Sequence, residues 1–280
     1  MPPEGRRSRP SVSAIDQDGL EVIARHAAGL ARAAPLLFVH GAFAGAWCWD
    51  EHFLPWFAAR GYDAHAVSLR GHGGSAGREA LDVSSIADYV DDVAQAAGRL
   101  AAPPLLIGHS MGGFVVQKYL ERHEAAGAVL MASVPPRGLV GPGLSLAIWN
   151  PAAALSLGSI QSFGQSWGSP SVMHETLFSS LLPTDRALRY LARMGPESTR
   201  AMLDMYGGDL PEQRKMGACP MLVMGAAEDA LIPSAFVRAT ARSYGAPPQI
   251  LDGIGHLMML DLAWRTAADC LLDWMRQNGF

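Results

Sequence analysis

The sequence between residues 108 and 112 reads Gly108-His109-Ser110-Met111-Gly112. The apolar run Pro104 to Ile107 precedes it and a helical pattern from Met111 to Leu120 follows, which predicts a tight turn that lifts Ser110 clear of a sheet. Glycines are required because a Cβ would collide across the turn. The start of the helix also directs free N–H groups and the positive end of its dipole at developing negative charge. Ser110 is therefore the predicted nucleophile.

Short apolar runs alternate with longer helical patterns on both sides of this turn. A hairpin is predicted in residues 11–27 around Asp18-Gly19, and further strands at 36–40, 63–68, 105–108, 128–132, 221–225 and 249–252. Helices are predicted near 47–60, 85–100, 111–122, 233–244 and 260–277. This order predicts an α/β fold with a mostly parallel central sheet flanked by helices.

The interval from Val134 to about Gly208 breaks the alternation, since seven prolines cut it into short pieces and no strand pattern is present. We predict an inserted helical cap at 134–208, so that 1–133 and 209–280 form two parts of one core. Because such a cap must leave a cleft over Ser110, its large side chains predict that this cleft is apolar. These side chains are Trp149, Phe163, Trp167, Met173, Phe178, Leu181, Leu182 and Met194.

A serine hydroxyl needs a neighbouring base and an acid that orients the base. The acid is expected in the loop after the predicted strand at 221–225, where Asp229 is the first choice and Glu228 the alternative. The base is expected at His256, which follows Gly255 after the last predicted strand. Serine, acid and histidine then occur in the chain order of the nucleophile-elbow hydrolases.

The loop His40-Gly41-Ala42-Phe43 follows the predicted strand at 36–40. It would place the N–H of Ala42 opposite that of Met111, and two such donors would stabilise the oxyanion of a tetrahedral intermediate. His40 is interpreted as structural. Phe43, His109 and Trp149 are the side chains predicted to contact the substrate.

Composition excludes several classes of protein. Of the 280 residues, 49% are hydrophobic and 17% are charged. The chain has 22 basic and 26 acidic side chains and no long run of either sign, so it lacks the basic patch expected of a nucleic-acid-binding protein. Cys48, Cys219 and Cys270 have no metal or redox spacing, so neither a metal nor an organic cofactor is expected. No apolar stretch is long enough for a membrane helix. The start MPPEGRRSRP lacks the apolar part of a signal peptide, and the expected location is cytoplasmic.

With these residues identified, the sequence resembles the α/β-hydrolase fold family over almost its whole length. The resemblance implies a nucleophile at Ser110, an acid at Asp229, a base at His256 and oxyanion donors at Ala42 and Met111. Five blocks match the family in order: His40-Gly41, Arg70-Gly71-His72-Gly73-Gly74-Ser75, Gly108 to Gly112, Asp229 with Pro233, and Gly255-His256.

The block from Gly41 to Trp49 is similar to the esterase-like branch that holds plant methyl-ester esterases and hydroxynitrile lyases. A lyase of that branch would be expected to carry a catalytic lysine, and none is identifiable here. Two positions depart from relatives: Leu69 stands where an aspartate commonly precedes the Arg-Gly-His-Gly turn, and Gly225 is four rather than three residues before Asp229. The second departure leaves Glu228 open as an alternative acid.

The sequence therefore predicts a serine hydrolase, a carboxylesterase that cleaves esters of apolar small molecules through an acyl-enzyme. Thioesterase, lactonase or C–C bond hydrolase action remains open, because all of them pass through the same oxyanion. A binding or receptor protein that keeps the fold without turnover is the alternative from another class.

Overall fold

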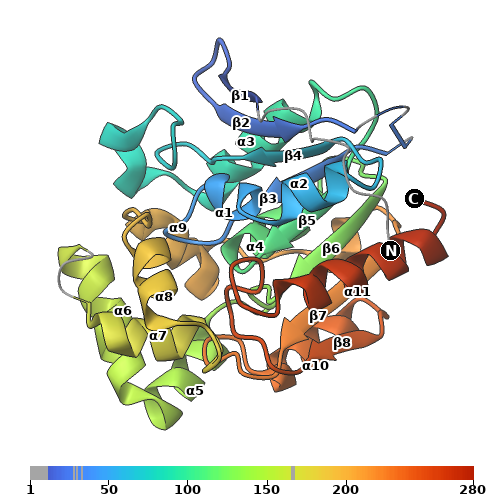
Figure 1. Ribbon diagram of the computed structural model, residues 1–280. Coiled ribbons are helices and arrows are strands. Elements are labelled where there is room, and N and C mark those ends of the chain that lie inside the picture. Colours follow the sequence, from blue (N-terminus) through green and yellow to red (C-terminus); the bar gives the residue numbers. More distant parts are fainter. Residues whose placement is uncertain (1–11, 28, 30, 33, 165–167) are drawn as a thin grey trace.

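The computed structural model describes residues 12–280 apart from 28, 30, 33 and 165–167 (Figure 1). The leader-like residues 1–10, the first residue of the predicted hairpin and Trp167 lie outside this part of the chain. Eight strands form one sheet in the order β1-β2-β4-β3-β5-β6-β7-β8. The hairpin β1 (Val12–Ile15) and β2 (Glu21–Arg25) joins β4 in antiparallel register, and all other neighbouring strands are parallel.

The central parallel strands form where the sequence is continuously apolar, since a strand that is buried on both faces needs an unbroken apolar run. Each of the six parallel strands lies within one residue of its predicted bounds, including the edge strand β8, which is only partly buried. All side chains of the three central strands β3, β5 and β6 are buried. The six are β3 (Leu36–Val39), β4 (Ala64–Val67), β5 (Leu105–His109), β6 (Gly127–Met131), β7 (Met221–Ala226) and β8 (Pro248–Leu251).

Helices cover both faces of the sheet, as Figure 1 shows for α2 and α11 in front of it. Phe38 and Ile107 pack with α1 (Trp47–Asp50), α2 (Phe53–Ala58) and α11 (Trp264–Gln277). Leu37 and Leu106 point to the other face, because successive side chains of a strand alternate. They pack with α3 (Ile86–Ala97), α4 (Met111–Tyr119) and α10 (Ser234–Ser243). The predicted α/β architecture is confirmed.

Residues 134–208, here called the cap segment, lie between β6 and β7 at one side of the sheet, in yellow-green to gold in Figure 1. Pro151 and Pro170 begin α6 and α7, where a missing N–H costs nothing. The described residues of this segment contain no strand. They form α5 (Val140–Trp149), α6 (Pro151–Phe163), α7 (Pro170–Leu177), α8 (Thr184–Leu191), α9 (Thr199–Leu203) and the π-helical turn η3 (Asp204–Gly208).

Two short helical turns complete the chain, η1 (Arg78–Val83) before α3 and η4 (Gln213–Lys215) before β7. The helix predicted near 47–60 is divided into α1 and α2. Pro55 explains the division, since a proline is tolerated in the first turn of a helix but not in its interior. The restart at Phe53 places Pro55 in that first turn.

Candidate active site

Ser110 occupies a sharp turn between β5 and α4. Its backbone has φ 52° and ψ −116°, a conformation that side-chain-bearing residues rarely adopt and that persists only where the surroundings enforce it. The Ser110 N–H donates to the carbonyl of Met131 at 3.0 Å, and the Ser110 carbonyl accepts from Val134 N–H at 3.1 Å. A Cβ on Gly112 would lie 2.4 Å from the carbonyl oxygen of Val39. The turn is therefore strained but fixed.

His256 and Asp229 meet in the loops that follow β8 and β7. The His256 Nδ1 lies 2.8 Å from Asp229 Oδ2, and both residues are buried. Asp229 Oδ1 accepts the N–H groups of Leu231 and Ile232, each at 2.8 Å. An ionised carboxylate only accepts hydrogen bonds, so this contact assigns the proton to Nδ1 and leaves Nε2 able to accept one.

Glu228 occupies a different position from the neighbouring Asp229. It is exposed, and its Oε2 accepts from Ser180 N–H at 3.4 Å. Of the two acids that the sequence left open, the structure places Asp229 against His256.

The loop that carries Ala42 runs beside the Ser110 turn. A Cβ on Gly41 would lie 3.0 Å from the Cβ of Ser110, so the chain passes in contact with it. His40 stabilises the loop, since its Nδ1–H donates to the Gly41 carbonyl at 2.8 Å and its Nε2 accepts from Leu69 N–H at 3.0 Å. Burial lowers the pKa of His40 to about 3, which keeps this ring neutral and suits a structural role.

A cavity of about 440 Å³ joins these groups. Ser110, His256, Ala42 and Met111 all line it, together with Phe43 and His109. The remaining wall comes mainly from apolar side chains of the cap segment, from Val134, Leu139, Leu146, Leu157, Met173, Leu177, Met194, Met202 and Met205 among others.

His109 lines the cavity but is already bonded. Its Nε2–H donates to the backbone carbonyl of His256 at 2.9 Å. Burial, with His256 close by, holds the pKa of His109 well below its ordinary value. This neutral side chain links the end of β5 to the loop of His256.

Trp149 does not line the cavity, which corrects the prediction that it contacts the substrate. Its side chain is 84% exposed at the end of α5. Leu139 and Leu146 face the cavity, whereas Leu144 and Ile148 are exposed on the other side of the helix. Trp149 is the last residue of α5, where its side chain lies in solvent. Of the other large cap residues, Met173, Phe178 and Leu182 are buried and Leu181 is 60% exposed.

Glu197 is a residue that sequence analysis did not identify. It is buried in the cap segment, and its Oε2 lies 3.1 Å from His72 Nε2 and accepts from Phe43 N–H at 3.3 Å. Its Oε1 accepts from the hydroxyl of Tyr89 at 2.7 Å and from Ser198 N–H at 2.7 Å. The carboxylate thereby holds Phe43, which has φ 64° and adjoins Ala42. No local motif marks this acid.

Asp261 is the second such residue. Its buried carboxylate accepts from Gly255 N–H at 3.0 Å, and from the N–H and hydroxyl of Ser179 at 2.7 Å each. Asp261 therefore connects the loop of His256 to the cap segment.

The described residues contain neither a metal cluster nor a membrane-spanning helix. Across the described ranges, no group of three or more His, Cys, Asp or Glu side chains is placed to hold a metal ion. No helix in this part of the chain is long and apolar enough to cross a membrane. Cys48, Cys219 and Cys270 are free thiols.

Comparison with known proteins identifies the family to which the chain belongs. The model of the alpha/beta hydrolase family matches residues 36–268. Pyrethroid hydrolase of Sphingobium wenxiniae is 31% identical over 112 residues, which are 39% of this chain and 38% of that protein. Monoacylglycerol lipase of Mycolicibacterium smegmatis is 25% identical over 242 residues, 80% of this chain and 82% of that one.

A solved esterase from Thermogutta terrifontis has the same fold, with a TM-score of 0.70 and 18% identity over 98% of this chain and 100% of that one. At this identity the likeness extends to the fold alone. The first three relatives by sequence are each matched over less than half of their own length.

Proposed function

Because this chain belongs to the alpha/beta hydrolase family, we propose that it is a serine hydrolase of carboxylic esters that works through an acyl-enzyme. The observation that carries the proposal is the 2.8 Å contact between His256 Nδ1 and Asp229 Oδ2, beside Ser110 in one cavity. The esterase and lipase names of its relatives support a hydrolase.

The proposed reaction begins when Ser110 Oγ attacks the carbonyl carbon of the ester and its proton passes to Nε2 of His256. Asp229 stabilises the imidazolium that forms. The N–H groups of Ala42 and Met111 stabilise the oxyanion, and each such donor typically contributes about 3 kcal/mol to lowering the barrier. His256 then protonates the leaving alcohol. Water, with His256 again as base, releases the acid and restores Ser110.

The proposed substrates are esters with apolar groups. Leu and Met are the commonest residues in the wall of the cavity, and Gln161, Thr199 and Tyr206 are the polar side chains that the cap segment adds to it. An unpaired charged or polar group buried against the apolar part of this wall would lose its hydration without compensation. A neutral ester needs polar contacts only at its carbonyl.

Labelling with a fluorophosphonate probe tests the proposal. The probe should modify Ser110, located by mass spectrometry of the digested protein, because only an activated serine reacts readily. Ser110→Ala should prevent labelling and lower the kcat for p-nitrophenyl butyrate on the order of 10⁶-fold, the scale known for a member of a triad. His256→Ala should suppress both labelling and turnover.

Two outcomes would contradict the proposal. Near-wild-type turnover in Ser110→Ala would place the chemistry elsewhere, and a folded wild-type protein that neither labels nor turns over would indicate a binding protein. A matched panel of an ester, a thioester and a lactone with the same acyl group separates the related activities through kcat/KM.

A further inference from the structure

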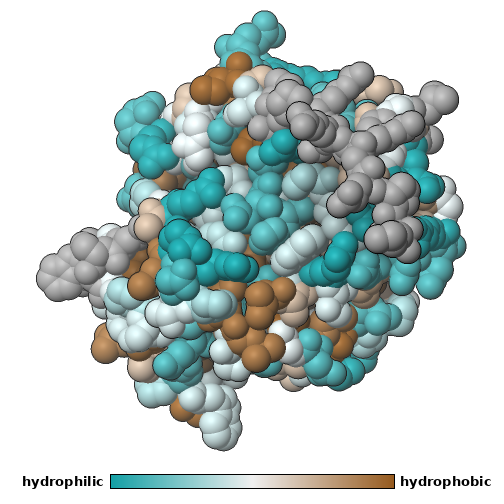
Figure 2. Space-filling view, in the orientation of Figure 1, coloured by the Kyte–Doolittle hydropathy of each residue, from teal (hydrophilic) through white to brown (hydrophobic). Residues whose placement is uncertain are grey.

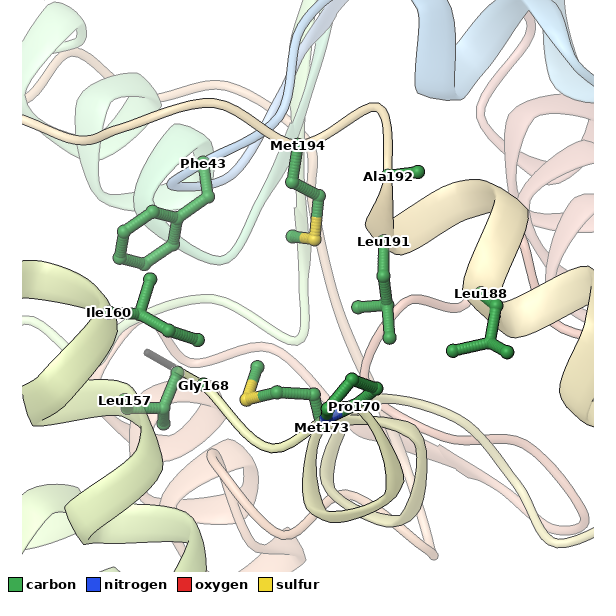
Figure 3. Close-up of a pocket in the computed structure, with 10 residues that line it drawn as sticks. All are labelled: Phe43, Leu157, Ile160, Gly168, Pro170, Met173, Leu188, Leu191, Ala192 and Met194. Carbon is green, nitrogen blue, oxygen red and sulfur yellow. The ribbon is translucent and has the colours of Figure 1, made fainter. Parts of the chain in front are cut away.

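A second hollow lies inside the cap segment, next to the cavity that contains Ser110. It has a volume of about 340 Å³ and is here called the cap cavity. Figure 3 shows Ile160 on α6, Met173 on α7 and Leu188 and Leu191 on α8 around it. Among the described residues, no charged side chain contributes to its wall. Ligand sites start at about 300 Å³, so the cap cavity is large enough to bind part of a small molecule.

The two cavities are adjacent, and the same side chains form part of both walls. Phe43, Leu157, Met173 and Met194 line both of them. A group bound near Ser110 therefore needs to pass only these side chains to enter the cap cavity.

The shared wall has a fixed side and an adaptable side. Phe43 is fixed, because its carbonyl accepts from Gly195 N–H at 2.8 Å and its N–H donates to buried Glu197. Met173 and Met194 are unbranched thioethers, which repack at low cost. Figure 3 shows the Met194 side chain extending into the space between Phe43 and Leu191. The passage is therefore expected to open past the methionines.

The far end of the cap cavity reaches the surface. Leu188 is 43% exposed and Ala192 is also exposed. Figure 2 shows hydrophobic residues among polar ones over this lower part of the molecule, where the helices of the cap segment lie. An apolar chain of a substrate bound at Ser110 would therefore extend through the cap cavity, and its far end would reach solvent.

We propose that the cap cavity is a second subsite of the ester substrate, which binds the distal part of an unbranched acyl or alkyl chain. This inference rests on the proposed function and narrows its substrate class to esters with a long chain. An unbranched chain is favoured over a ring system because it can pass between Phe43 and the two methionines by small movements of their side chains.

Chain-length series measure this subsite. The first series is p-nitrophenyl acetate, hexanoate and dodecanoate, and the second is acetate esters of short and long alcohols, all below their aggregation concentrations. Leu191→Trp fills the cap cavity, since Leu191 points into it (Figure 3). The matched control is Leu155→Trp on the solvent side of α6, where Leu155 is 74% exposed.

Each buried methylene contributes up to about fourfold in affinity. Exclusion of two or more methylenes should therefore lower the ratio of kcat/KM for the long ester to that for the acetate at least about tenfold in Leu191→Trp. Leu155→Trp should keep the wild-type ratio. The series in which the ratio changes identifies the acyl or the alcohol side as the occupant.

A binding measurement separates failure of this subsite from failure of the proposed function. The Kd for p-nitrophenyl dodecanoate is measured by calorimetry in Ser110→Ala and in the double variant that also carries Leu191→Trp. The Kd should be at least about tenfold higher in the double variant. If wild type hydrolyses no ester while this difference persists, the hydrolase proposal fails and the chain-binding site stands. If Leu191→Trp does not fold, Ile160→Phe replaces it. An unchanged ratio and an unchanged Kd in a folded variant would overturn the subsite.

Discussion

At the scale of single residues, the two carboxylate oxygens of Asp229 have different hydrogen-bond partners. Oδ2 lies against His256, while Oδ1 accepts two backbone N–H groups. In Asp229→Asn the amide oxygen can keep the backbone bonds, but its NH₂ then faces His256 Nδ1 and favours the wrong tautomer. We expect kcat for an activated ester to fall about 10⁴-fold, measured with a folded variant of unchanged circular dichroism.

Glu228→Gln is the matched control for that variant, since Glu228 precedes Asp229 and is exposed. It should change kcat by less than about threefold, as expected for a surface position. A larger loss in Glu228→Gln than in Asp229→Asn would reverse the assignment of the acid.

Sequence analysis could place residues that belong to short motifs. Ser110 lies between a strand and a helix, and Asp229 and His256 follow strands in the expected order, so their common location follows from the parallel sheet. Glu197 and Asp261 could not be found, because their partners Phe43 and Ser179 are 154 and 82 residues away. Such contacts exist only once the cap segment is packed on the core.

At the scale of elements, strands were more predictable than helices. A strand buried on both faces is recorded in the sequence as an apolar run with two ends. A helix of the cap segment instead has both a core side and a solvent side that can be apolar, as α5 illustrates with Leu146 toward the cavity and Ile148 exposed.

The loop of His256 packs directly on the segment that follows α7. A Cβ on Gly255 would lie 2.4 Å from the carbonyl carbon of Phe178 and 2.7 Å from Ser179 N. These are backbone atoms, so relief requires movement of the loop or of the cap segment. Gly255→Ala should lower kcat about 10²-fold, the effect of misplacing a catalytic group by about 1 Å, as measured with p-nitrophenyl butyrate.

Gly217→Ala is the control for this substitution, because no atom lies within 4 Å of a Cβ placed at Gly217. It should retain full kcat. Wild-type kcat in Gly255→Ala, with both variants equally stable to heat, would show that the contact with Phe178 does not position His256.

At the scale of the whole molecule, buried carboxylates tie the cap segment to the core, and two of them, Glu197 and Asp261, also contact the proposed site. Glu197 reaches from the cap segment to His72, and Asp261 reaches from the core to Ser179. Each also binds a backbone N–H beside a proposed catalytic group, that of Phe43 next to Ala42 and that of Gly255 next to His256. The position of the cap segment and the geometry of the site are therefore mechanically coupled.

The link through Glu197 depends on charge. Burial alone would lower the pKa of His72, but the Glu197 carboxylate raises it above its ordinary 6.5. Burial alone would raise the pKa of Glu197, but His72 and its hydrogen bonds lower it below 4.5. Among the other groups near His72, burial raises the pKa of the Tyr89 hydroxyl and keeps it protonated, His40 stays neutral, and Arg78 opposes the charge on His72.

These directions predict how the pair contributes to stability. Because the pKa of His72 is raised in the folded protein, His72 stabilises the fold below pH 6.5. This contribution is lost as the pH rises through the pKa of His72 in the folded state. Because the pKa of Glu197 is lowered in the folded protein, Glu197 stabilises the fold above pH 4.5. This contribution is lost as the pH falls through the pKa of Glu197 in the folded state. The free energy of unfolding of wild type minus that of Glu197→Gln should therefore be largest between pH 4.5 and 6.5.

Urea unfolding of both proteins from pH 4 to 9 measures this difference, with Glu79→Gln at an exposed position as the control. Within the window the loss should be about 3 kcal/mol, the typical cost of breaking a buried ion pair, because without the Glu197 carboxylate the buried ring of His72 loses its proton. Toward pH 9 the difference in unfolding free energy should shrink, because His72 is then neutral in both proteins. The two proteins then differ only in the hydrogen bonds that residue 197 makes. A difference that stays constant, or that grows at alkaline pH, would mean that His72 and Glu197 are not a charged pair.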